Sequence, residues 1–141
     1  MKASHVVMVL GLGLVLLTAV NASADPRRDA IMAGLLVQAQ KDDPGFTGFS
    51  AERGDAFFKA THKGGKEGID SCTSCHGSSP QGKGQTRAGK AIEPMAVSKN
   101  PARYTNKDDV SKWFTRNCNV VLGRECTAKE KGDFITYMMG Q

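Results

Sequence analysis

The sequence lacks the patterns that mark several common classes of protein. No stretch of its 141 residues alternates convincingly between apolar and polar side chains as a half-buried strand does, and no segment repeats another. The chain therefore offers no βαβ unit. The basic residues in its second half are not interleaved with aromatic ones, so no nucleic-acid partner is expected. These absences leave a mostly α-helical chain whose length suits one domain.

Cysteine is also scarce, with four in the chain, and two of them belong to a C-x-x-C-H motif, Cys72-Thr73-Ser74-Cys75-His76. Two thiols at this spacing can each form a thioether with a haem vinyl group, and the next histidine is delivered to the iron. A thioredoxin-like pair would need a βαβ setting, and a zinc site would need two more ligands at short spacing. The motif predicts one covalently attached haem c, with Cys72 and Cys75 as anchors and His76 as an axial ligand.

The first 24 residues have the pattern of a secretory signal peptide. Lys2 precedes an apolar run over residues 6–20, and small residues follow as far as Ala24. A single membrane anchor is the alternative, but the run is near the lower limit for a span and ends in small residues. We expect cleavage after Ala24, export to a bacterial periplasm, where haem c is attached, and no membrane span in the mature chain.

The positive charge is unevenly distributed. Loss of Lys2 would leave 18 basic and 14 acidic residues, a formal net charge of +4. Basic residues are concentrated after the haem motif, where Glu93 alone opposes them. This segment is either a docking face for an acidic redox partner or an ordinary solvated loop. Three of its members, Arg87, Lys90 and Arg103, are candidates for contact with the haem propionates. The whole set is Lys83, Arg87, Lys90, Lys99, Arg103 and Lys107.

Apolar spacing and capping residues predict the helices. A helix over 29–41 belongs to an N-terminal segment, 25–45, that we expect to pack on a cytochrome c domain formed by 46–141. Ser50 is the expected cap of a helix over 51–60, and Thr105 that of a helix over 106–117. Thr127 and Glu130 predict a capping box that opens a last helix, which ends near residue 139.

Two of these helices have residues suited to a close crossing. Gly54 and Phe58 lie four positions apart in the helix over 51–60, and Phe134 and Tyr137 lie three apart in the last helix. A glycine permits close approach, and the aromatic rings fill the crossing. The arrangement resembles the crossed N- and C-terminal helices of class I cytochromes c, although two unrelated amphipathic helices would show the same residues.

The ligand on the other side of the iron decides the function. By position alone Met95 is favoured, because it lies in the loop between the haem motif and the last helix, as in an electron carrier. Met138 and Met139 fall in the last helix and are better explained as core or chain-end residues. His62 would give a bis-histidine site, but its loop precedes the haem motif.

Motifs spread over the chain from about Phe46 change this ranking. They are Gly48-Phe49-Ser50-Ala51, Arg53-Gly54, Cys72-Thr73-Ser74-Cys75-His76, Arg87-Ala88-Gly89-Lys90, Pro94-Met95-Ala96, Asn100-Pro101, Lys112-Trp113-Phe114, Arg116-Asn117-Cys118 and Leu122-Gly123-Arg124-Glu125-Cys126-Thr127. In this order and spacing they resemble the sphaeroides haem protein (SHP) family, a group of oxygen-binding monohaem c-type cytochromes. The Gly- and Lys-rich loop over 62–68 is not part of the resemblance.

The resemblance implies that Asn117 is the distal iron ligand and that Cys118 and Cys126 form a disulfide. A short return over 119–125, expected to be strand-like, would then be tied to the helix end. From the residues alone, Asn117 would be a helix C-cap, and Asn119 is the fallback ligand. Trp113 shares a face with Asn117 and either walls the distal pocket or packs in the core.

These expectations combine into one functional hypothesis. A carboxamide is a weak ligand that can leave when the iron is reduced, which opens a position for O₂, NO or CO. The chain would then be an exported monohaem cytochrome that accepts electrons from a cytochrome partner, and the resemblance suggests a dihaem cytochrome c as this donor. The alternatives are a simple electron shuttle that uses Met95, and a gas sensor or scavenger without turnover.

Overall fold

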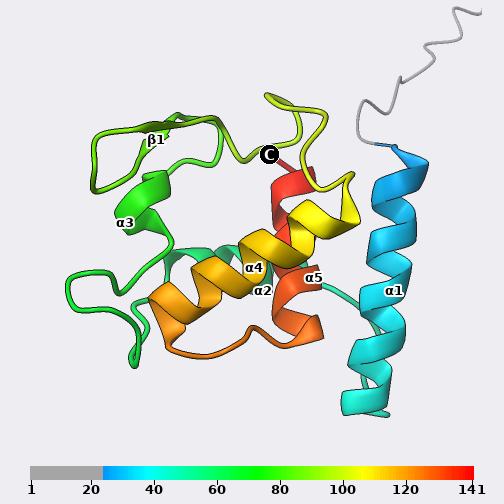
Figure 1. Ribbon diagram of the computed structural model, residues 1–141. Coiled ribbons are helices and arrows are strands. Elements are labelled where there is room, and N and C mark those ends of the chain that lie inside the picture. Colours follow the sequence, from blue (N-terminus) through cyan, green and yellow to red (C-terminus); the bar gives the residue numbers. More distant parts are fainter. Residues whose placement is uncertain (1–23) are drawn as a thin grey trace, which may run out of the picture.

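The computed structural model describes residues 24–141, which are mostly helical (Figure 1). Its helices are α1 (Pro26–Asp42), α2 (Ala51–Lys59), α3 (Thr73–His76), α4 (Lys107–Leu122) and α5 (Ala128–Met139). Two short strands, β1 (Gly84–Gln85) and β2 (Ala91–Ile92), pair antiparallel. The expectation of a mostly helical fold is confirmed. Nearly all of the predicted signal peptide lies outside the described residues, and no helix within 24–141 has the length and apolarity to cross a membrane.

The crossing of α2 and α5 forms the centre of the core (Figure 1). Gly54 lies directly against the backbone of Asp133, where a Cβ atom would overlap the carbonyl oxygen. The ring centre of Phe58 is 6.1 Å from that of Phe134 and 6.0 Å from that of Tyr137. Phe58 is fully buried, which contributes about 2 kcal/mol to folding. The crossing expected from these four residues is therefore present.

Both crossing helices have side-chain caps at their N-terminal ends. Ser50 Oγ accepts a hydrogen bond from the Arg53 amide at 3.2 Å. Thr127 and Glu130 form the predicted capping box, with reciprocal hydrogen bonds of 3.1 and 2.8 Å. Such caps stabilise a helix start by about 1 kcal/mol each, so local sequence already specifies where α2 and α5 begin.

The helix α1 stands at the edge of the domain and packs against α5 (Figure 1). Its best-buried side chain is Arg28, with 1% of its surface exposed. The Arg28 guanidinium donates to the carbonyl oxygen of Pro101 at 2.6 Å and to that of Arg103 at 3.0 and 3.1 Å. The N-terminal helix is thus fastened to the loop that precedes α4 by charge-assisted hydrogen bonds as well as by apolar contact.

Helix α4 differs from the prediction at both ends. Its cap is Asn106, whose Oδ1 accepts from the Asp109 amide at 2.9 Å, whereas Thr105 was expected. It continues five residues beyond Asn117 and ends at Gly123, which has a left-handed φ of 70°. The strand-like return predicted over 119–125 is therefore wrong, because residues 119–122 form the last turn of the helix.

Candidate functional site

The C-x-x-C-H motif forms the four-residue helix α3. The amide of His76 donates to the Cys72 carbonyl at 3.1 Å, and that of Gly77 donates to the Thr73 carbonyl at 3.0 Å. Gly77 has a φ of 69°, which ends the turn. Cys72 and Cys75 are free thiols on this turn, as two thioether anchors must be.

The hairpin β1–β2 packs against α3 through β1. A Cβ atom at Gly84 would lie 2.9 Å from the Cα of His76 and would overlap the Cys75 carbonyl. Ser71 Oγ accepts from the Thr73 amide at 3.1 Å at the start of the turn. Backbone contact therefore fixes the direction in which the haem motif presents its side chains.

Burial determines the chemistry of this motif. It lowers the pKa of His76 to about 4, with help from the nearby charge of Arg103, so the imidazole is neutral and can bind a metal. The His76 Nδ1 atom is buried without a hydrogen-bond partner. Burial also raises the pKa of Cys72 to about 11, which disfavours the thiolate that a redox-active cysteine pair needs. A neutral imidazole and two unpaired thiols fit a covalent haem better than a thiol–disulfide centre.

Asn117 lies on the solvent-facing side of α4 and away from both ends of the helix. Among the described residues none hydrogen-bonds to its carboxamide, which is exposed. Its place five residues before the helix end excludes the C-cap interpretation. The fallback residue, Asn119, is held differently, because its Nδ2 donates to the Thr115 carbonyl at 2.7 Å. Of the two asparagines, only Asn117 presents an unengaged amide.

Trp113 lies one turn before Asn117, and 46% of its surface is exposed. Lys112 Nζ lies 5.0 Å from the Trp113 ring and Arg116 Cζ lies 5.6 Å from it, so two cations flank the indole. Packing in the core, one of the two expectations for Trp113, is wrong. Phe114 takes that position instead, with its ring centre 5.4 Å from that of Phe134.

The other candidate ligands are occupied elsewhere. Met95 is buried in the α2–α5 core beside Phe58 and Met138. His62 Nε2 is 3.0 Å from the Phe57 carbonyl, and the two rings are 5.0 Å apart. Met138 is fully buried, and Met139 packs against the same core. Each of these side chains already has protein contacts that coordination of a metal would have to break.

The last two cysteines, Cys118 and Cys126, form a disulfide with their Cα atoms 5.6 Å apart. This is the pairing that the family resemblance implies. The bridge is buried among Ile69, Val121 and Leu122. It joins the residue directly after Asn117 to the start of α5, so the C-terminal part of α4 is covalently held.

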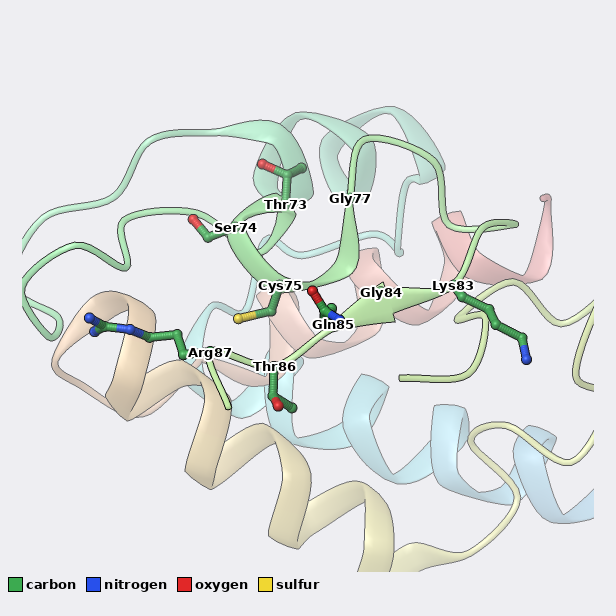
Figure 2. Close-up of a pocket in the computed structure, with 9 residues that line it drawn as sticks. All are labelled: Thr73, Ser74, Cys75, Gly77, Lys83, Gly84, Gln85, Thr86 and Arg87. Atoms are coloured by element: carbon green, nitrogen blue, oxygen red, sulfur yellow. The ribbon is translucent and has the colours of Figure 1, made fainter. Parts of the chain in front are cut away.

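The three basic candidates have different surroundings. Arg87 lines an open pocket of about 450 Å³ beside Cys75, with Lys83 at the opposite end (Figure 2). Lys90 is exposed and is not among the lining residues. The Arg103 guanidinium donates to the carbonyl oxygens of Pro94 at 3.0 Å and Glu93 at 2.6 Å. Of the three, Arg87 is the one that lines this pocket.

Some residues of the site were not predicted. Thr73, Ser74, Gln85 and Thr86 line the pocket beside Cys75 (Figure 2). The first two belong to the variable positions of the C-x-x-C-H motif, and the others lie in a two-residue strand and the turn that follows it. Strands this short leave no periodic signal, so the sequence contains no pattern that would have identified them.

Comparison with known proteins places this geometry in context. A family profile described as a domain of unknown function (DUF1924) matches residues 44–138. Cytochrome c-type protein SHP from Cereibacter sphaeroides is 50% identical over 91 residues, which cover 64% of this chain and 70% of the relative. Cytochrome c'' from Methylophilus methylotrophus is 36% identical over 104 residues, which cover 72% of this chain and 71% of the relative.

Solved structures show the same relationship. Oxidised SHP, described as an oxygen-binding cytochrome c, superposes with a TM-score of 0.74 and 42% identity, over 81% of this chain and 96% of the other. Oxidised cytochrome c'' from Methylophilus methylotrophus superposes with a TM-score of 0.73 and 30% identity, over 82% of this chain and 95% of the other. The likeness therefore includes nearly the whole of each solved chain.

Proposed function

The chain belongs to the SHP family of c-type cytochromes, and we propose that its one covalent haem c is anchored by Cys72 and Cys75, with His76 and Asn117 as iron ligands in the oxidised protein. In this proposal reduction of the iron would release Asn117, and a diatomic ligand such as O₂ or NO would take its place. The proposal includes export to the periplasm and an electron-donor cytochrome, for which the family resemblance suggests a dihaem protein.

The unengaged carboxamide of Asn117 is the observation that carries this proposal. Met95, His62 and Asn119 all have internal contacts that compete with coordination. Asn117 has no such contact among the described residues, and its helix places it on the same face as Trp113. Two relatives support the reading: one is described as an oxygen-binding cytochrome c, and a structural study of the other addresses haem-ligand detachment.

The protein groups have distinct roles in this scheme. When bound, the haem would supply an iron that changes oxidation state and accepts a small ligand. His76 is kept neutral by burial and donates a ring nitrogen. The carbonyl oxygen of Asn117 would be a weak ligand for the iron. Its NH₂ group can later donate a hydrogen bond to a diatomic ligand. Trp113, one turn earlier on the same face of α4, would lie beside the bound ligand.

The test is a comparison of Asn117→Ala with Asn119→Ala and Met95→Leu. Asn117→Ala should change the ferric absorption spectrum and abolish the delay that detachment of the amide imposes on CO binding after reduction. Asn119→Ala should leave both unchanged, because its side chain is tied to Thr115. A wild-type ferric spectrum and CO kinetics in Asn117→Ala would refute the assignment. A drastic change in Met95→Leu, with a near-infrared charge-transfer band in the wild type, would instead favour the electron shuttle.

Turnover is tested separately from binding. The reduced holoprotein, supplied with electrons by a dihaem cytochrome c, should consume O₂ catalytically if it acts as a terminal reductase. Reversible binding without consumption would make it a sensor or scavenger, with the same ligands. This measurement leaves the assignment of Asn117 untouched, so the two parts of the proposal can fail independently.

A further inference from the structure

The Gly- and Lys-rich loop before the haem motif packs on the last turn of α4. The amide of Lys66 donates to the carbonyl oxygen of Val120 at 2.8 Å. Gly64 lies so close that a Cβ atom there would be 2.9 Å from the carbonyl oxygen of Leu122. The last carbonyl groups of a helix have no hydrogen-bond donor within the helix. The Lys66 amide therefore supplies a donor that the Val120 carbonyl would otherwise lack.

Gly65 also makes a close contact with the end of α4. It is not among the glycines with a positive φ, so its backbone conformation is open to other residues. A Cβ atom at this position would nevertheless overlap the carbonyl oxygens of both Val120 and Val121. The glycine is therefore required by the closeness of two backbones, one in the loop and one in α4. Any side chain at Gly65 must push the two apart.

These contacts link the two sides of the candidate site. Val120 and Val121 lie about one helical turn beyond Asn117. Ile69, at the end of the same loop, packs with Cys118 and Val121. Cys72 follows Ile69 by three residues. The loop that holds the end of α4 therefore leads directly into the haem motif.

We infer that Gly65 and the Lys66 amide position Asn117 opposite His76, by fixing the last turn of α4 against the haem-bearing segment. The loop and the Cys118–Cys126 disulfide hold that turn together, so Asn117 leaves the iron by rotation of its side chain, without movement of the helix. The released amide then stays within reach of an incoming diatomic ligand. This inference rests on the proposed function.

The experiment compares Gly65→Ala with Gly68→Ala in the holoprotein. Gly68 belongs to the same loop, but its φ is +72° and a Cβ atom there would meet nothing within 4 Å. Gly68→Ala thus strains the loop without separating it from α4. Ferric absorption and electron paramagnetic resonance spectra report the ligand state, and stopped-flow mixing with CO reports release of the amide.

Gly65→Ala should weaken the Asn117 bond about tenfold, the size of effect seen when groups that orient a metal ligand are lost. The ferric spectrum would then show a mixture with a high-spin fraction, and CO would bind faster after reduction. Gly68→Ala should keep the wild-type spectrum. Wild-type spectra and CO rates in Gly65→Ala, with altered ones in Asn117→Ala, would overturn the positioning role alone. Unaltered spectra in Asn117→Ala would instead overturn the proposed function.

A measurement on the wild type covers the case in which Gly65→Ala does not fold. Amide hydrogen exchange in segments 62–70 and 118–126 should proceed at the same rate in the oxidised and the reduced holoprotein, because the helix end stays in place. Faster exchange in both segments on reduction would show that the end of α4 moves, and would overturn the inference.

Discussion

The two sides of the candidate site are built in contrasting ways. On the proximal side, five consecutive residues from Cys72 to His76 supply both thiols and the imidazole from one helical turn. On the other side, the proposed ligand Asn117 lies in a sixteen-residue helix whose end is held by a disulfide and a glycine-rich loop. A covalent anchor needs only local geometry, whereas the proposed ligand, if it leaves and returns, needs a rigid frame around it.

The largest expected effect comes from removing the proximal anchors. Cys72→Ser combined with Cys75→Ser should abolish covalent attachment of the haem completely, because no other free thiol exists among the described residues. Haem staining after denaturing electrophoresis measures this. The matched control is Cys118→Ser with Cys126→Ser, which should keep the stain. Stain retained in the first variant would show that the motif is not the anchor.

Both sides rest on the α2–α5 crossing, where Asp133 is 3% exposed. Its carboxylate accepts from Arg53 Nε at 2.7 Å, from Lys129 Nζ at 2.9 Å and from the Ser50 amide at 2.7 Å. Asp133→Asn should lower the free energy of unfolding by about 3 kcal/mol, since these charge-assisted hydrogen bonds to a buried carboxylate are weakened, while the half-exposed Arg53 and Lys129 side chains regain solvent. Denaturant unfolding of the holoprotein measures it, and Asp109→Asn, an exposed residue paired with Lys112, is the control.

The same residue predicts a pH dependence. Burial raises the pKa of Asp133, but hydrogen bonds from Arg53, Lys129 and the Ser50 amide outweigh it, so the net pKa lies below the ordinary value. The unfolded chain then binds this proton at a higher pH than the folded one. The stabilisation is fully present above the ordinary aspartate pKa of about 4 and is lost as the pH falls from there through the lowered pKa of the folded state. In Asp133→Asn this part of the acid dependence should disappear.

Removal of the distal bridge has a somewhat smaller effect on stability. Cys118→Ala with Cys126→Ala opens a short loop, which should lower the free energy of unfolding by about 2.5 kcal/mol in the chain-entropy model. Urea unfolding with and without a reductant measures this, because the reductant should destabilise the wild type alone. An unchanged midpoint in the double variant would show that the loop over 64–66 holds the helix end by itself.

The smallest effect is expected on the surface of the proximal side. Lys83 pairs with Glu93 at 3.2 Å, but both side chains are mostly exposed. Lys83→Ala should change the free energy of unfolding by no more than about 0.5 kcal/mol, because solvent screens exposed pairs. A loss of 2 kcal/mol or more in the same unfolding assay would mean that the pocket beside α3 contributes to stability.

Several elements of the fold follow correctly from local sequence patterns, while the haem-binding roles of Cys72, Cys75 and His76 stay predictions. The C-x-x-C-H spacing, the crossing residues Gly54 and Phe58, and the capping box at Thr127 are all local patterns, and the structure contains the predicted crossing and the predicted box. Within each helix, the pattern depends on neighbours within a few positions in the chain, although the crossing itself joins α2 and α5. Short-range geometry of this kind is encoded directly in residue type and spacing.

The distal side was predicted less well. The sequence predicts a helix that ends at Asn117, with Val120 and Val121 in a strand-like return over 119–125. In the structure these residues are helical, since the loop over 64–66 and the disulfide hold the turn. Trp113 was also compatible with the core, but Phe114 packs there because α4 is rotated to place Cys118 inside.

The sequence by itself determined the chemistry available to this protein: two thiols and an imidazole in one turn, a weak amide donor, and a second pair of cysteines. Only the tertiary structure decided which candidate on the distal side is left without competing contacts. Met95 and His62 are drawn into packing and hydrogen bonds, and Asn119 is tied to its own helix, while Asn117 is not. The reason is physical, because whether a side chain is available to a ligand depends on everything else that it contacts.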